Sequence, residues 1–111
     1  GATEPRQSIQ GVTTKTITYR DLMKTYYRPE RYRWDDVASA PFLSIDEPGK
    51  ANDLFISFDD GKLAAMKVKY AKDTALGGVI VWELGGGYED GRPAGQRDRV
   101  LKQVRYAAFG R

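Results

Sequence analysis

The chain contains no cysteine and no histidine among its 111 residues. The lack of cysteine excludes disulfides, thiolate nucleophiles and zinc–thiolate sites. The lack of histidine excludes imidazole metal ligands, the commonest general base, and every Ser–His or Cys–His catalytic pair. Because no cluster of acidic residues has the spacing of a metal site either, we expect no metal and no cofactor.

Long apolar runs and a strong charge imbalance are also missing. The longest apolar run has about six residues, which is too short to span a membrane. Eighteen basic residues against fifteen acidic ones give a net charge of +3, and the two signs are mixed along the chain. That balance gives little support to a nucleic-acid partner. We therefore expect neither a membrane nor a nucleic acid as partner.

The residues that are present indicate one small globular domain or a piece of a larger one. Hydrophobic residues make up 41% of the chain and charged residues 30%, and two tryptophans and seven tyrosines can anchor a core. A complete (β/α)8 barrel is excluded, because it needs roughly 250 residues.

The first half of the chain predicts an arm, a helix and an antiparallel sheet. Residues 1–16 are polar and predict an extended arm, with a short strand over 11–17. Four residues share one face of a helix that begins at Thr18 and ends before Pro29: Tyr19, Leu22, Met23 and Tyr26. Strands are expected at 32–34, 41–45 and 54–58, and the short connections between them favour an antiparallel meander.

The second half predicts a helix, a strand, a glycine-rich loop and a final helix. Asp59 and Asp60 precede a helical stripe and are expected as N-cap and first-turn acids; the stripe comprises Leu63, Met66, Lys67 and Tyr70. Val79–Leu84 has the continuous apolar character of a strand buried on both faces. Such a strand needs two neighbours that this chain does not offer, which indicates that the chain is part of a larger structure.

The end of this predicted strand is the most informative candidate site. Trp82 can stack on the apolar face of a sugar ring, or it can be a core residue behind the strand. Glu83 should point to the opposite side and is better explained as an ion-pair partner than as an acid or base. Gly85–Gly87 suggest a phosphate loop, but no Gly-Lys-Ser/Thr follows, and Asp90 stands where a dinucleotide fingerprint needs glycine.

A second candidate lies in the first half. Residues 26–34 interleave tyrosines and a tryptophan with arginines, as single-stranded nucleic-acid binders do. An exposed face of an antiparallel sheet has the same character. A steep salt dependence of oligonucleotide binding would support the nucleic-acid alternative.

Several blocks of the sequence, in order and with consistent spacing, resemble family 18 glycoside hydrolases of the chitinase type. They are Tyr-Arg-Asp-Leu-Met at 19–23, Trp-Asp-Asp at 34–36, Ala-Pro-Phe-Leu at 40–43, Phe-Ile-Ser-Phe-Asp-Asp at 55–60 with Lys67, and Leu-Gly-Gly-Val-Ile-Val-Trp-Glu-Leu at 76–84. The resemblance runs from about Thr14 to Phe109.

The resemblance implies an α+β fold in two segments. In the family, a (β/α)8 barrel carries a small insertion domain between strand seven and helix seven. Residues 1–58 resemble that insertion, a small antiparallel sheet with a helix. Residues 59–111 resemble a helix–strand–helix segment from the end of the barrel: helix seven at 60–74, strand eight at 78–84 and the final helix at 96–109.

The resemblance also assigns the substrate-binding residues. Trp82 matches the tryptophan that forms the floor of the subsite for the reacting N-acetylglucosamine. Asp21 matches an acidic residue that lines the substrate wall, and Asp60 matches a structural acid at a helix start. The catalytic signature Asp-x-x-Asp-x-Asp-x-Glu is absent from this chain. We therefore expect no catalytic residue here, and we expect the 111-residue chain alone to be inactive.

These observations favour a fragment of a hydrolase that acts on chitin or N-acetylglucosamine polymers by substrate-assisted, retaining hydrolysis. The expected partner is chitin or an N-acetylglucosamine oligosaccharide, and the parent protein is expected to be secreted or in the cell envelope. The alternatives are a non-catalytic, lectin-like carbohydrate-binding module and a basic, aromatic single-stranded nucleic-acid binder. Because the strand Val79–Leu84 would have unpaired edges in a monomer, we also expect a homodimer formed through it.

Overall fold

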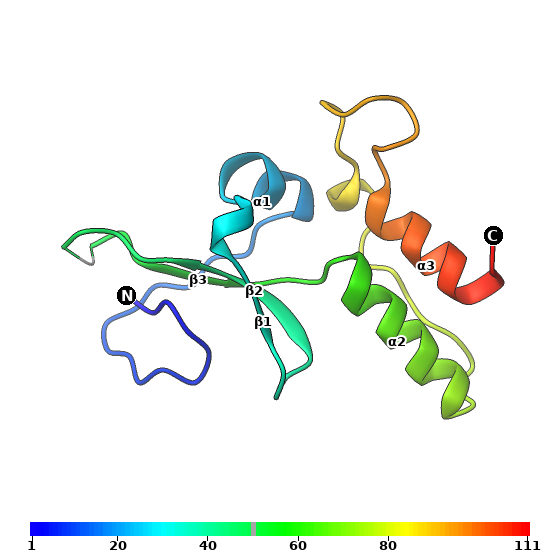
Figure 1. Cartoon of the computed structure of the whole chain (residues 1–111), viewed down its shortest axis with the longest axis horizontal. Coiled ribbons are helices and arrows are strands. Elements are labelled where there is room, and N and C mark those ends of the chain that lie inside the picture. Colours follow the sequence, from blue (N-terminus) through cyan, green and yellow to red (C-terminus); the bar gives the residue numbers. More distant parts are fainter. Residues whose placement is uncertain (50) are drawn as a thin grey trace. The chain divides into compact units, whose positions relative to one another are not determined.

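The computed structural model describes residues 1–49 and 51–111 (Figure 1). In chain order it contains α1 (Tyr19–Thr25), η1 (Pro29–Arg31), β1 (Tyr32–Asp35), β2 (Ala40–Ile45), β3 (Leu54–Ser57), α2 (Gly61–Asp73), η2 (Gly85–Gly87) and α3 (Arg99–Phe109). This confirms an α+β chain with one small antiparallel sheet. The chain forms two compact units: unit 1 comprises residues 1–17 and 21–58, and unit 2 comprises residues 18–20 and 59–111.

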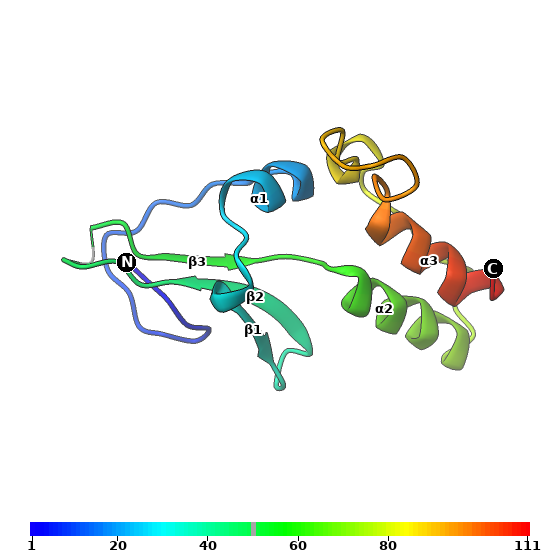
Figure 2. The ribbon, with the colours of Figure 1, turned by 45° about the horizontal axis from the view of Figure 1, so that its top comes forward.

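The core of unit 1 is centred on β2, the middle strand of a three-stranded sheet with the order β1-β2-β3 (Figures 1 and 2). Leu43 on β2 lies opposite Tyr32 on β1 and Ile56 on β3. Its side chain is fully buried, and cross-strand neighbours flank it on both sides. Phe42 and Phe55 pack with ring centroids 5.3 Å apart. The three expected strands are therefore confirmed to within a residue at each end. Lys50, in the connection between β2 and β3, lies outside the described residues.

One expectation for the first residues of the chain is wrong, and another is confirmed in part. Residues 11–17 form no strand in the described chain; Gly11 adopts a φ of 64°, which interrupts an extended backbone. The first helix ends at Thr25, before Pro29 as expected, so Tyr26, which was expected on its apolar face, lies just beyond it. The amides of Tyr26 and Tyr27 both donate to the carbonyl of Leu22.

An ion pair attaches the N-terminal arm to the sheet. The guanidinium of Arg6 donates to both carboxylate oxygens of Asp35, at 2.6 and 3.1 Å. The amide of Val37 donates to the same carboxylate at 3.0 Å. The pKa of Asp35 is lowered, chiefly by the hydrogen bond from Arg6, against an opposing effect of desolvation. Asp35 therefore fixes both the arm and the turn that follows β1.

Unit 2 is built on α2 and α3, which lie side by side in both ribbon views (Figures 1 and 2). Asp60 is the N-cap of α2, as expected, and its Oδ1 accepts a hydrogen bond from the amide of Leu63 at 2.8 Å. At the other end of α2, Lys72 donates to the carbonyl of Ala107 on α3 at 2.7 Å. The buried face of α2 consists of Leu63, Ala64, Val68 and Ala71.

The expected apolar stripe on α2 is only partly correct. Leu63 is buried, but Tyr70 is 64% exposed and Met66 is also exposed. Tyr70 points to solvent, whereas Ala64 and Ala71 face the interior. Small residues at these positions let a neighbouring element approach closely.

The expected strand Val79–Leu84 is wrong for this structure. The described strands are β1, β2 and β3, and residues 78–84 belong to none of them. A strand buried on both faces needs partners for its N–H and C=O groups on both edges. The chain supplies no such neighbour here, so the segment is left without a ladder and exposed.

Candidate functional site

Trp82 is the most exposed large aromatic side chain of the candidate site. It lies in the connection between α2 and η2, and its side chain is 94% exposed, as is that of Ile80. Val79 and Val81 are 44% and 39% exposed. This alternation shows that Ile80 and Trp82 face one side and the two valines the other. The alternative of a core tryptophan is therefore wrong for the described chain.

The carboxylate of Glu83 lies against η2. A Cβ built on Gly86 would come within 3.3 Å of Glu83 Oε1 and 3.6 Å of Thr18 Cβ. Gly86 is buried, and a larger residue there would be tight against the Glu83 carboxylate but in ordinary contact with Thr18. The amide of Gly87 donates to the carbonyl of Leu84 at 3.3 Å. The glycines at 85–87 therefore make a tight turn beneath Glu83 rather than a phosphate loop.

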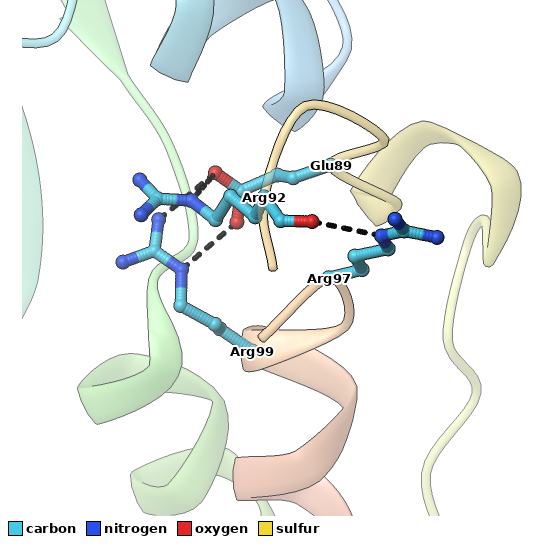
Figure 3. A network of polar contacts seen from close by, with 4 residues as sticks. All are labelled: Glu89, Arg92, Arg97 and Arg99. Atoms are coloured by element: carbon cyan, nitrogen blue, oxygen red, sulfur yellow. Dashed lines mark hydrogen bonds and ion pairs between the residues drawn. The ribbon is translucent and has the colours of Figure 1, made fainter. Parts of the chain in front are cut away.

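A buried carboxylate follows this turn, and the sequence analysis did not single it out. Glu89 is 6% exposed and lies between Arg92 and Arg99 (Figure 3). Arg92 Nε donates to Glu89 Oε1 at 2.6 Å. Arg99 donates through Nε to Oε2 at 2.9 Å and through a terminal nitrogen to Oε1 at 3.0 Å. We call these three residues the Glu89 clamp.

The electrostatics of the clamp keep Glu89 ionised. Burial alone raises its pKa, but hydrogen bonds from Arg99 and Arg92 and their charges outweigh burial, and the net pKa is lowered. Tyr19, in the same unit, has a raised pKa, chiefly because it is buried; the positive charges of Arg99 and Arg92 oppose this shift. The signal available in the sequence was a glutamate three residues before one arginine and ten before another at the start of a helix.

Asp21, the second expected substrate-binding residue, lies exposed in the first turn of α1. An acidic side chain is favourable at that end of a helix. Asp21 belongs to unit 1 and Trp82 to unit 2, and each is placed only within its own unit. The expected role of both residues in substrate binding stays a prediction.

The arginines between residues 26 and 34 hold the backbone of unit 1. Arg31 donates to the carbonyl of Tyr26 at 3.0 Å. Arg33 donates to the carbonyls of Glu30 and Tyr32, at 2.7 and 2.8 Å. These guanidinium groups therefore have a structural role in shaping η1 and the start of β1.

The described site offers one group open to a ligand, the exposed indole of Trp82, whereas both oxygens of the ionised Glu89 carboxylate are already engaged by Arg92 and Arg99. Across residues 1–49 and 51–111, no group of three or more acidic side chains is placed to hold a metal ion. In the same ranges, no helix has the length and apolar character needed to cross a membrane.

Comparison with known proteins identifies a family and several relatives that this chain resembles. The family model described as glycosyl hydrolases family 18 matches residues 3–87. The chain is 36% identical over 73 residues to chitinase A1 of Niallia circulans, covering 64% of this chain and 10% of that protein. It is 33% identical over 102 residues to chitinase B of Serratia marcescens, covering 90% of this chain and 20% of that protein.

Solved structures agree with these matches. A family 18 N-acetylglucosaminidase from Paenibacillus barengoltzii has a TM-score of 0.61 and 26% identity, over 83% of this chain and 24% of that one. The chitinase domain of a spore coat protein from Clostridium difficile has a TM-score of 0.55 and 22% identity, over 82% of this chain and 23% of that one; this second likeness supports the fold alone. The chain thus spans between a tenth and a fifth of the length of the two curated relatives.

Proposed function

The chain belongs to family 18 of the glycosyl hydrolases and is of the chitinase type, and from this premise we propose that it lines part of a sugar-binding cleft in a longer enzyme. The observation that carries the proposal is Trp82. Its indole is almost fully exposed on a segment whose other outward side chain, Ile80, is apolar. A flat apolar ring with one N–H donor suits the apolar face of a sugar ring, with the polar tip left to hydroxyl or amide groups.

In this proposal the substrate is chitin or another polymer of N-acetylglucosamine. Trp82 forms the floor under the reacting sugar, and Asp21 lines the wall of the cleft. Hydrolysis in the whole enzyme is substrate-assisted: the acetamido oxygen of the sugar attacks the anomeric carbon while an acid protonates the leaving oxygen. Residues outside this chain supply that acid, since the sequence lacks the signature that would carry it.

The same proposal explains the unpaired segment 78–84. Residues 1–58 belong to the insertion domain, and residues 59–111 supply helix seven, strand eight and the last helix of a barrel. The apolar run Val79–Trp82 is then a barrel strand whose two neighbours lie elsewhere in the enzyme. A secreted or cell-envelope enzyme would meet its polymer directly, and we propose that location for the parent.

We propose, in addition, that the isolated chain forms a homodimer through Val79–Leu84, because an exposed apolar segment without a ladder is a template for pairing. Light scattering at high concentration measures this association. A clean monomer would contradict it, and Val81→Pro, which removes one amide donor, should reduce a dimer that pairs by strands.

Calorimetric titration of the 111-residue chain with N-acetylglucosamine oligomers tests the sugar site. We expect saturable binding that Trp82→Ala abolishes. Two matched variants should leave binding unchanged within about twofold, since each alters a large side chain outside the proposed stack: Trp34→Phe in unit 1 and Ile80→Ala on the same face as Trp82. A single-stranded oligonucleotide in place of the sugar should give no saturable heat.

Two results would contradict the assignment of Trp82. One is binding that survives Trp82→Ala, and the other is the absence of saturable binding by the unmodified chain. Equal losses in Trp82→Ala and Ile80→Ala would also count against stacking, because an aliphatic side chain offers no ring face.

A further inference from the structure

We propose that Glu89 is a positioning residue: its carboxylate fastens the loop between η2 and α3 and thereby fixes the end of the segment that carries Trp82. All contacts of the clamp lie within unit 2. Its relevance to sugar binding rests on the function proposed for Trp82.

The clamp joins a loop to a helix. Arg92 belongs to the loop, whereas Arg99 is the first residue of α3. Both reach the same carboxylate, and both oxygens of Glu89 are engaged. Charge-assisted hydrogen bonds of this kind are about twice as strong as neutral ones. Separating a buried carboxylate from its two cationic partners costs free energy, because it leaves a buried charge without an opposite charge beside it.

Further contacts close the loop around the clamp. The amide of Glu89 donates to the carbonyl of Arg97 at 2.9 Å. Arg97 Nε donates to the carbonyl of Arg92 at 2.8 Å, and its guanidinium points away from the carboxylate (Figure 3). Lys102 on α3 donates to the carbonyl of Gly95. The loop is therefore tied at both ends and across its middle.

The clamp is linked to Trp82 by short-range contacts. The amide of Tyr88 donates to the carbonyl of Gly85 at 3.4 Å, which caps η2 at the residue directly before Glu89. Glu83, next to Trp82, lies against Gly86 in the same turn. The segment between Trp82 and Glu89 is thus a tight turn, so the clamp restrains the indole's own backbone from its C-terminal side.

The test compares Glu89→Gln with Asp90→Asn in the 111-residue chain. Both variants remove one carboxylate charge, and Asp90 is exposed. Limited trypsin cleavage after Arg97 and Arg99, identified by peptide mass, reports opening of the loop. We expect Glu89→Gln to speed this cleavage about tenfold or more, because loop opening becomes more frequent. Asp90→Asn should stay within about twofold of the unmodified chain.

A second readout follows Trp82 itself. In a Trp34→Phe background, Trp82 is the sole tryptophan, and time-resolved anisotropy measures its local motion. We expect Glu89→Gln to increase the amplitude of that motion, while α-helical circular dichroism keeps its intensity. We further expect weaker binding of N-acetylglucosamine oligomers, by about fivefold.

Cleavage and anisotropy that match Asp90→Asn would overturn the positioning role, whatever happens to sugar binding. Faster cleavage with looser anisotropy, in a chain that binds no sugar even unmodified, would uphold the clamp and refute the proposed function. Should Glu89→Gln fail to fold, Arg92→Gln tests the positioning role instead, because it removes only the contact between Arg92 and Glu89. It also leaves the trypsin pattern unbiased, because the bond between Arg92 and Pro93 is not a trypsin site.

Discussion

Leu43→Ala removes three carbon atoms from the centre of the sheet in unit 1. The side chain is 0% exposed and lies between Tyr32 and Ile56 on the neighbouring strands. At about 0.8 kcal/mol for each buried carbon group, the lost transfer free energy is about 2.4 kcal/mol. The cavity left between two neighbouring strands raises the expected loss to about 3–4 kcal/mol. For a unit of this size, that is a large share of the free energy of unfolding.

Urea unfolding followed by tryptophan fluorescence measures this loss. In a Trp82→Phe background the signal comes from Trp34 on β1, and so from unit 1 alone. With a slope of about 1.5 kcal/mol per molar urea, the expected loss moves the midpoint down by about 2 M. The circular dichroism of the helices α2 and α3 reports the unfolding of unit 2. Its urea midpoint should not change if the two units unfold independently.

Val37→Ala is the matched control, because Val37 lies in the turn between β1 and β2 of the same sheet but is 81% exposed. Its free energy of unfolding should change by no more than about 0.5 kcal/mol. A loss below about 1 kcal/mol for Leu43→Ala, or one equal to that of the control, would refute the placement of Leu43 in a packed core.

Two further outcomes follow from single contacts. The pKa of Asp35 is lowered below its usual 3.8, chiefly by the hydrogen bond from Arg6; its contribution to stability is therefore present above that value and lost as the pH falls through the lower folded pKa. The urea midpoint of unit 1 should accordingly fall more steeply on acidification than in Asp35→Asn, and parallel curves would contradict this. Gly86→Ala places a methyl group 3.3 Å from the Glu83 carboxylate, whereas a Cβ at Gly87 meets nothing within 4 Å. Thermal unfolding should therefore show about 1 kcal/mol of destabilisation for Gly86→Ala and little for Gly87→Ala. Equal effects of the two substitutions would show that the contact at Gly86 is not tight.

The sheet and the start of α2 could be predicted from the sequence because both depend on local patterns. Alternating apolar residues and short turns define β1 to β3 without reference to any distant element. The N-cap at Asp60 is likewise set by the residues directly after it. The buried face of α2 could not be predicted as well: Ala64 and Ala71 face inward and Tyr70 outward, and that choice depends on the packing of unit 2 rather than on the helix alone.

The Glu89 clamp could not be predicted for a related reason. A glutamate in a glycine-rich loop is ordinarily solvated, and its burial here requires Arg99, which another element supplies. Sequence spacing gives no geometry for a contact between two residues ten positions apart. Only the folded loop shows that both oxygens of the carboxylate have cationic partners.

The segment 78–84 depends both on its local sequence pattern and on elements distant from it. Its apolar run predicts burial, and yet Ile80 and Trp82 are each 94% exposed while Val79 and Val81 are half covered. The side of the segment with the two valines is thus partly covered, and the side with Ile80 and Trp82 is almost fully exposed in the described chain. A barrel interior would cover Ile80 along with Trp82, whereas a cleft at the end of a strand would leave the later residue open to a ligand. Since Trp82 is the later of the two, its position along the segment adds to its exposure in favouring a sugar platform over an uncovered core residue.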